Sequence, residues 1–372
     1  MIDKVSLSKE WLEEKRIKYA KDPSIIESMI YALYLLEQLT QTELNFIFKG
    51  GTSLLLLLEK PARFSVDIDI IVSPTIDKEK LESYLLKISE GSSFVRMELD
   101  ERRSYKAGVP KAHYKFIYKS NVPTKNKNNE VIENPEREIL LDVLFAENPY
   151  PVIIDKPIVT EWIKIEGEPL LVKMPCVNSI TGDKLTAYAP NTIGVPYQMG
   201  KEKEIIKQLF DIATLFELID DIELVKKSFG LTAVEEIKYR TEKQINIEHV
   251  LRDTIETGIL LSRREKQLEG DQAKYDELIK GLKQFNDFVF DSNFKIEKAL
   301  VASARAAYIA VVILHDYKGA LNKFTEDIPT EEYLITHPDY NFLNKKLKFV
   351  EKGEALFYWN EVLTLLIAAK NK

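Results

Sequence analysis

The 372-residue sequence contains one cysteine, Cys176, and no long hydrophobic run. A single cysteine excludes an internal disulfide framework and a cysteine-based zinc site, and it fits a reducing compartment such as the cytoplasm. The most apolar stretch, LLLLL, ends at Glu59, far short of the roughly 20 residues that span a bilayer. The charged N-terminal stretch lacks the apolar core of a signal peptide. We therefore expect a cytoplasmic protein without a membrane partner.

Histidine is also scarce. The four histidines are far apart in the sequence and lack the spacing of metal ligands: His113, His249, His315 and His337. A zinc site is therefore not expected, and each histidine is predicted to be structural or exposed.

Charge is unevenly distributed along the chain. The net charge is −7, which argues against non-specific coating of nucleic acid but is compatible with a local basic groove. Residues 101–137 hold nine Lys or Arg and only four Glu, among aromatic residues such as Tyr105 and Tyr114. Basic residues with stacking aromatics suit RNA, whereas a solvated hairpin is the alternative explanation.

The hydrophobic pattern divides the chain into two parts. Helices are expected in residues 1–45, at 53–58 and at 78–89, and a long exposed loop at 120–137. Strands are expected at 46–49, 66–72, 94–100, 112–119, 138–146, 162–166 and 169–173. Because helical periodicity dominates after Pro175, the prediction is an α+β chain. A mixed β-sheet domain with flanking helices over residues 1–175 is followed by a helical domain over 176–372.

Two acidic residues lie one residue apart in the most apolar part of the chain. Asp67 and Asp69 belong to RFSVDIDIIV, and alternate side chains of a strand share one face. Two carboxylates a few ångströms apart repel each other unless one takes up a proton. A divalent cation removes that conflict, and Mg²⁺ prefers a few carboxylates plus substrate phosphates. The pattern therefore predicts a Mg²⁺ site.

A glycine turn precedes these acids. Gly50 and Gly51 permit a tight turn, and Thr52 and Ser53 begin a short helix whose N–H groups suit a phosphate. A D-x-D pair alone also occurs in glycosyltransferases and phosphatases, but the upstream turn favours nucleotide chemistry. A third carboxylate is expected where two metals act, and Asp142, inside the apolar stretch ILLDVLF, is the best candidate.

The segments GGTSL, RFSVDIDI and LDVLF resemble the nucleotidyltransferase superfamily related to DNA polymerase β. More closely, the chain resembles the AbiEii/AbiGii toxin family of bacterial abortive-infection and toxin–antitoxin systems, over roughly residues 45–220. The matching positions are the Lys49–Leu54 turn, Arg63, Ser65, Asp67, Asp69, Lys184, Lys207 and Asp211. The sequence departs from the family pattern in its 120–137 insertion and in the C-terminal residues beyond the match.

The resemblance implies a role for each matching residue. The catalytic set would be Asp67, Asp69, Lys184 and Asp211, to which Asp142 is added because of its place in an apolar strand. Asp67, Asp69 and Asp142 would hold Mg²⁺. The nucleotide-binding set would be Gly50, Gly51, Thr52, Ser53, Arg63, Ser65, Lys184 and Lys207. Two simpler explanations stay open at this point. Lys184 fits a solvated helix lysine, and Lys207 with Asp211 fits a surface ion pair at i and i+4.

The implied activity is transfer of an NMP from an NTP to an acceptor with release of pyrophosphate. From the resemblance, we expect the acceptor to be a tRNA 3′ end and the protein to be a toxin with a separate antitoxin partner. The alternatives are a small-molecule or protein acceptor, and a nucleotide-binding module without turnover.

Overall fold

The structure is a computed structural model that describes residues 1–372 except 107, 241–243, 265–266, 291–293 and 371–372. The chain forms two compact units, which are described separately. Unit 1 comprises Met1–Asn148, Val152–Cys176 and Phe288–Asp291. Unit 2 comprises Pro149–Pro151, Val177–Asp287 and Ser292–Lys372. The described residues include no helix with the length and apolar character that crossing a membrane requires.

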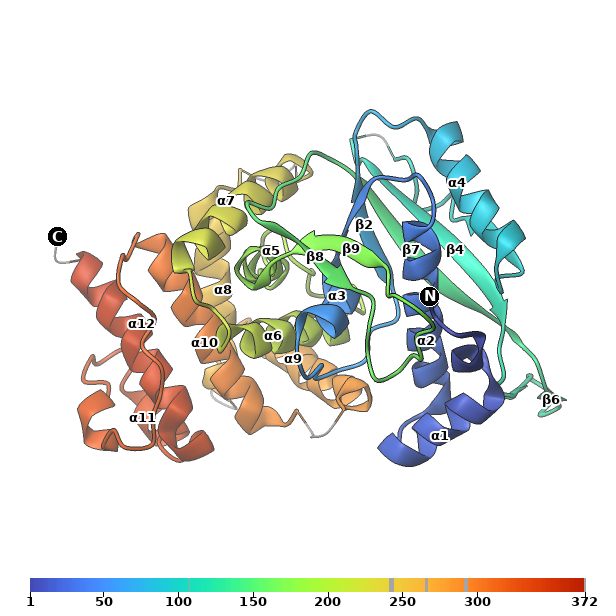
Figure 1. Ribbon diagram of the computed structural model, residues 1–372. Helices are drawn as coiled ribbons and strands as arrows, with labels where there is room; N and C mark the ends of the chain where they lie inside the picture. The colour runs from blue at the N-terminus through green and yellow to red at the C-terminus, as the bar shows by residue number, and fades with distance from the viewer. Residues whose placement is uncertain (107, 241–243, 265–266, 291–293, 371–372) are drawn as a thin grey trace. The chain divides into compact units, whose positions relative to one another are not determined.

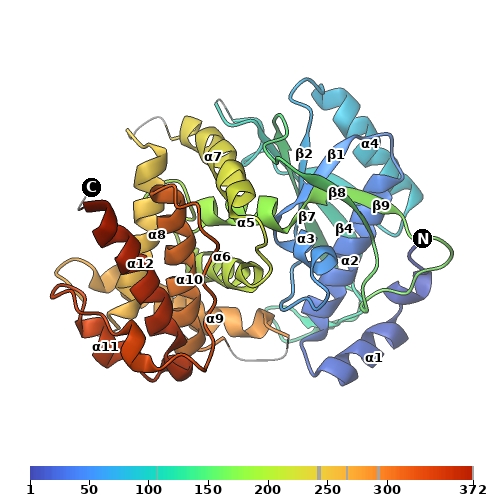
Figure 2. The ribbon, with the colours of Figure 1, turned by 60° about the vertical axis from the view of Figure 1, so that its left-hand side comes forward.

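Unit 1 is built on a five-stranded mixed sheet in the order β1-β2-β7-β4-β3 (Figures 1 and 2). Its strands are β1 (Phe46–Lys49), β2 (Ile68–Val72), β7 (Glu136–Phe145), β4 (Lys111–Lys119) and β3 (Arg96–Leu99). β2 and β7 run parallel, and the other neighbouring pairs are antiparallel. The predicted α+β class with a mixed sheet is therefore confirmed.

One face of this sheet is covered by helices. Unit 1 contains η1 (Lys4–Leu7), α1 (Lys9–Tyr19), α2 (Pro23–Thr40), α3 (Gly50–Leu57) and α4 (Lys78–Gly91). α2 is capped by Asp22, begins at a proline and contacts β2 and β7, while α4 contacts β3. Along β7, Ile139, Leu141 and Val143 are buried. The intervening residues, including Asp142, are half-buried, so the acidic face lies opposite the core.

Two sequence predictions in unit 1 need correction. The strand expected at 162–166 does not form, because this segment turns and places the fully buried ring of Trp162 against Tyr19, Phe64 and Phe290. β9 (Leu171–Pro175) pairs instead with β8 (Ile153–Pro157), a segment that the hydrophobic pattern left unassigned.

The expected loop at 120–137 also contains regular structure. It holds a small exposed hairpin of β5 (Thr124–Lys125) and β6 (Val131–Ile132). The Asn126 side chain closes its turn by accepting hydrogen bonds from the N–H groups of Asn128 and Glu130.

Unit 2 is helical, as predicted. Its α-helices are α5 (Val177–Ala187), α6 (Glu202–Phe216), α7 (Ile222–Lys238), α8 (Ile247–Ser262), α9 (Gln272–Phe285), α10 (Ile296–Leu314), α11 (Phe342–Leu347) and α12 (Glu354–Lys370). Shorter turns are η3 (Thr330–Tyr333), η4 (Val350–Gly353) and η2 (Asn286–Phe288), whose last residue is assigned to unit 1.

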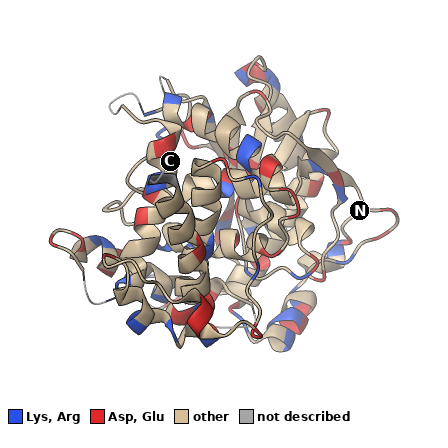
Figure 3. Cartoon of the chain, turned by 90° about the vertical axis from the view of Figure 1, so that its left-hand side faces the viewer, with Lys and Arg blue, Asp and Glu red and all other residues tan. Residues whose placement is uncertain are grey.

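The centre of unit 2 is α10. It contacts α6, α8 and α12, and alanines along its length are buried, which lets the neighbouring helices approach closely. The buried indole N–H of Trp359 on α12 donates to the Ser262 hydroxyl on α8 at 2.9 Å. In contrast to this apolar interior, Lys and Arg are interspersed with Asp and Glu along the helices of unit 2 (Figure 3).

Two helical glycines of unit 2 provide a packing test. A Cβ at Gly281 on α9 would overlap the Glu202 carbonyl at the start of α6, whereas a Cβ at Gly230 on α7 would meet no atom within 4 Å. We expect Gly281→Ala to lower the free energy of unfolding by about 1–3 kcal/mol through overpacking. The matched control, Gly230→Ala, should raise it by about 0.5–1 kcal/mol. Urea denaturation measures both changes, and equal effects would contradict the close packing of α9 on α6.

Candidate active site

Four charged or titratable residues lie in a row across the sheet of unit 1. In the strand registers, Lys49 on β1 faces Asp69 on β2, Asp69 faces Asp142 on β7, and Asp142 faces His113 on β4. Facing residues of neighbouring strands share one side of a sheet, so these four side chains form what we call the charged row. All four are half-buried. The tertiary structure thus brings together two of the predicted metal ligands, Asp69 and Asp142.

Asp142 has two cationic or titratable neighbours. Its Oδ1 lies 2.5 Å from Nδ1 of His113, and its Oδ2 lies 3.8 Å from the guanidinium of Arg103. Sequence reasoning dismissed His113 because it lacks ligand spacing along the chain. The sequence did contain a signal for this contact. His113 and Asp142 each lie in a strand with buried apolar residues, and a hairpin-like segment joins the two strands.

The glycine turn lies directly against Asp69. Gly50 has a φ of +77°, a conformation that favours glycine, and a Cβ at this position would overlap the Asp69 carboxylate. Only glycine therefore lets the start of α3 approach the acid so closely. The first N–H groups of a helix lack partners within that helix, so this end of α3 supplies donors next to a carboxylate.

The hydroxyls of the turn are buried and bonded within unit 1. The Thr52 hydroxyl is hydrogen-bonded to the main-chain carbonyl of Asp67 and, at 2.9 Å, to the Ser65 hydroxyl. Ser53 donates to the carbonyl of Gly50 at 2.8 Å. β2 begins at Ile68 rather than at the predicted residue 66. Phosphate binding by these hydroxyls stays a prediction.

The segment before β2 is held by a second part of the chain. The backbone of Arg63 forms an isolated bridge with Val289, and the N–H of Phe64 donates to the carbonyl of Phe288 at 2.8 Å. The Arg63 side chain is buried and donates to the carbonyl of Phe64. Arg63 and Ser65 are therefore buried beside the acidic strand, and their nucleotide-binding roles stay predictions.

The remaining predicted residues belong to unit 2. The Lys184 ammonium on α5 lies 2.8 Å from the Asp211 carboxylate on α6 and also donates to Gln208. Lys184 is 5% exposed and Asp211 is 1% exposed, whereas Lys207 pairs with Glu204 at 3.4 Å. The two simpler explanations are therefore wrong, because Lys184 is not solvated and Asp211 does not belong to a surface pair.

The metal ligands do not form a complete group. Within the described part of the chain, no three His, Cys, Asp or Glu side chains form a group that could hold a metal ion. Asp67 precedes β2, so the strand register does not place it beside Asp69 and Asp142. The structure thus supplies two adjacent carboxylates, whose hard oxygen atoms match the ligand preference of Mg²⁺.

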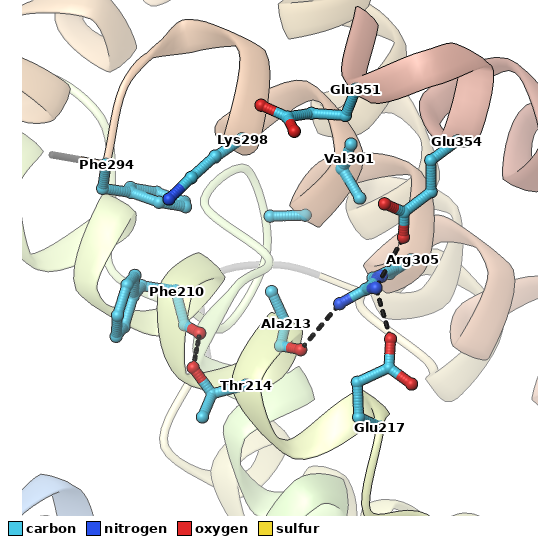
Figure 4. A pocket seen from close by; sticks show the side chains of 11 residues that line it. Phe210, Ala213, Thr214, Glu217, Phe294, Lys298, Val301, Arg305, Glu351 and Glu354 are labelled. Atoms are coloured by element: carbon cyan, nitrogen blue, oxygen red, sulfur yellow. Dashed lines mark hydrogen bonds and ion pairs between the residues drawn. The ribbon is translucent and has the colours of Figure 1, made fainter. Parts of the chain in front are cut away.

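Unit 2 also contains a cavity of about 350 Å³ between α6, α10 and the start of α12 (Figure 4). Arg305 donates to the carbonyl of Ala213 and forms ion pairs with Glu217 and Glu354 across this cavity. Burial raises the pKa of Glu354. None of the predicted site residues lines the cavity, and the Arg305 contacts connect three helices.

Gly50 provides a direct test of the turn. We expect Gly50→Ala to abolish nucleotidyl transfer, because the new methyl group would displace the Asp69 carboxylate. The matched control is Gly167→Ala, since Gly167 also has a positive φ but a methyl group at this position would meet no atom within 4 Å. Both variants should lose about 1–2 kcal/mol from the left-handed backbone. Activity and thermal melting measured together separate the two effects, and an active Gly50→Ala variant would contradict the close approach.

The buried pair of unit 2 provides a second test. Removing one partner, as in Asp211→Leu, should lower the free energy of unfolding by about 3–5 kcal/mol because an uncompensated charge stays buried. The double variant Lys184→Met/Asp211→Leu should recover most of this stability. We expect the double variant to fold but to lack transfer activity. A stable and fully active double variant would show that the pair serves packing alone.

Comparison with known proteins gives a family match. The model of one family, described as the nucleotidyl transferase AbiEii toxin of a type IV toxin–antitoxin system, matches residues 34–294. Comparison with curated proteins finds no match. The family match covers the glycine turn, the charged row and the Lys184–Asp211 pair, and it spans more than half of the chain. The protein is therefore a nucleotidyltransferase that belongs to the AbiEii toxin family of type IV toxin–antitoxin systems.

Proposed function

We propose that the protein transfers an NMP from an NTP to the 3′ end of a tRNA in a Mg²⁺-dependent reaction. The observation that carries this proposal is the register of β2 and β7, which sets Asp69 opposite Asp142 beside the Gly50 turn. The family match supplies the reaction class and implies a cognate antitoxin. The Mg²⁺ dependence and the tRNA acceptor are proposals that go beyond the family match.

Asp69 and Asp142 would hold Mg²⁺, whereas Asp67, which precedes β2, stays a predicted ligand that the strand register does not place beside them. Two adjacent carboxylates disfavour each other's charge, and a divalent cation offsets that repulsion. When bound, Mg²⁺ would favour deprotonation of the acceptor hydroxyl and neutralise charge on the triphosphate. The chain's own contribution is to keep the carboxylates close together, through the β2–β7 ladder and the Gly50 contact.

The NTP phosphates would bind at the start of α3. Because the hydroxyls of Thr52 and Ser53 are bonded within unit 1, the backbone N–H groups of this turn are the proposed donors to phosphate. Lys184 would stabilise the charge that develops on the leaving pyrophosphate. Its ion pair with Asp211 holds the ammonium in one place, which reduces the cost of orienting it during the reaction.

The acceptor RNA would bind near the turn that joins β3 to β4. Arg102, Arg103 and Lys106 are exposed on this turn, and Arg103 reaches Asp142. In contrast, Lys115 and Lys119 on β4 pair with acids of β7 at 3.0 and 2.9 Å. Arg103 thus brings positive charge of the basic segment to the charged row, where phosphates of an RNA end would be neutralised.

One expectation about this segment is wrong in part. Tyr114 is fully buried, so it provides no surface on which an RNA base could stack. Tyr105 is exposed, but its hydroxyl is hydrogen-bonded to that of Tyr114 at 2.7 Å, and the Lys78 ammonium lies over its ring. The RNA proposal therefore depends on charge rather than on stacking.

Labelled nucleotides test the reaction directly. Wild-type protein incubated with Mg²⁺, total bacterial tRNA and each α-³²P-labelled NTP in turn should label tRNA with one of them. Asp69→Ala should reduce labelling by about 100-fold or more, as expected when a group that stabilises the transition state is lost. The control Asp155→Ala removes an exposed aspartate on β8 that pairs with Lys173, and it should leave labelling unchanged.

The molecule that carries the label distinguishes the possible acceptors. Label on the protein itself, or on a small molecule, would replace tRNA with another acceptor while retaining the transferase. Absence of label and of pyrophosphate release with every NTP would contradict the proposed reaction. Labelling that persists in Asp69→Ala would contradict the assignment of the charged row.

A further inference from the structure

We propose that His113 is a positioning residue, which holds the Asp142 carboxylate in the orientation that binds a divalent cation beside Asp69. This inference rests on the proposed metal site of unit 1. It assigns a role to a histidine that the spacing of residues along the chain does not connect with the acids.

The main chain of His113 is fixed from two sides. β4 pairs with β7 along its whole length, so that His113 faces Asp142. On the other side, its N–H donates to the Ser104 hydroxyl at 2.8 Å, and its carbonyl accepts from the N–H of Asp100 at 2.8 Å. The Ser104 side chain is buried. The position from which the imidazole reaches Asp142 is therefore set by the backbone.

The side-chain contact restricts Asp142 in turn. The imidazole Nδ1 lies 2.5 Å from Oδ1 of Asp142, and the histidine side chain is 13% exposed. A carboxylate with one oxygen held by a fixed partner loses freedom to rotate about its terminal bond. The second oxygen, Oδ2, lies 3.8 Å from the Arg103 guanidinium, which is a looser contact than the one at Oδ1. Oδ2 is thus the atom of Asp142 that is better placed to bind a cation.

A purely structural role explains this contact less well. The backbone ladder already joins β4 to β7 from Lys111 to Lys119, so a side-chain bond is not needed for strand pairing. The contact also lies on the half-buried face of the sheet, opposite the core residues Leu141 and Val143. In addition, the row ends in Lys49 on one side and His113 on the other, with the acids between them. This arrangement fits a role in positioning the two carboxylates rather than a role in core packing.

Known behaviour of metal sites gives the expected size of the effect. Ligands of bound metals are themselves oriented by hydrogen bonds, and removal of such a partner typically costs 10–100-fold in metal affinity or activity. Nδ1 of histidine and Nδ2 of asparagine are both attached to Cγ. His113→Asn therefore keeps a donor near the original position, whereas His113→Ala removes it.

The experiment compares His113→Ala and His113→Asn with wild type, using full-length protein and Mn²⁺ as the probe. Electron paramagnetic resonance measures bound Mn²⁺, and the Mg²⁺ concentration for half-maximal tRNA labelling gives a second reading. We expect about 10–100-fold weaker Mn²⁺ binding in His113→Ala, a matching rise in the Mg²⁺ requirement, and recovery to within about 5-fold in His113→Asn. The control His337→Ala removes a half-buried histidine of unit 2 and should change neither value.

Each outcome decides a different question. Wild-type Mn²⁺ affinity in a folded His113→Ala variant would overturn the positioning role and leave the metal site standing. An equal loss of Mn²⁺ affinity in His113→Ala and His113→Asn, with unchanged melting temperatures, would show that the Nδ1 donor does not cause the effect. This outcome would also overturn the positioning role. If wild type binds no Mn²⁺, or binds it equally well after Asp69→Ala, the proposed metal site itself is wrong.

Discussion

The parallel pairing of β2 with β7 is the interaction on which the candidate site depends. It places Asp69 opposite Asp142, although 72 residues separate them along the chain. Parallel neighbours need a crossover, and here α4, β3 and β4 lie between the two strands in the sequence. β4 then pairs antiparallel to β7 and brings His113 to the same row. A shift of the register by one residue would move either acid to the buried face, so the ladder sets the position of both proposed metal ligands.

Concentrating like charges in this way has an energetic cost that the surrounding residues reduce. Lys49 and His113 flank the two acids in the charged row, and Arg103 approaches Asp142 from the β3–β4 turn. Gly50 lets the start of α3 approach Asp69 closely. These neighbours balance the carboxylates without fully covering them, because all four residues of the row stay half-buried. Under the proposed function, such a row would exchange an internal partner for a cation.

Unit 2 shows a different solution for a buried charge. Lys184 and Asp211 neutralise each other almost completely out of contact with water, where an unpaired charge would be strongly destabilising. Replacing such a pair by apolar residues often costs little stability, so its presence is weak evidence for a structural role alone.

The sequence by itself determined the fold class, the helical character of the second half, the glycine turn and the two acids of the D-I-D motif. These features follow from local spacing, because alternation and glycine content act within a few residues. Only the tertiary structure decided that His113 and Arg103 contact Asp142, that Thr52 bonds to the Asp67 carbonyl, and that β8 rather than residues 162–166 pairs with β9. Those contacts join segments far apart in the chain, and their register is selected by packing of the whole unit, which no local pattern encodes.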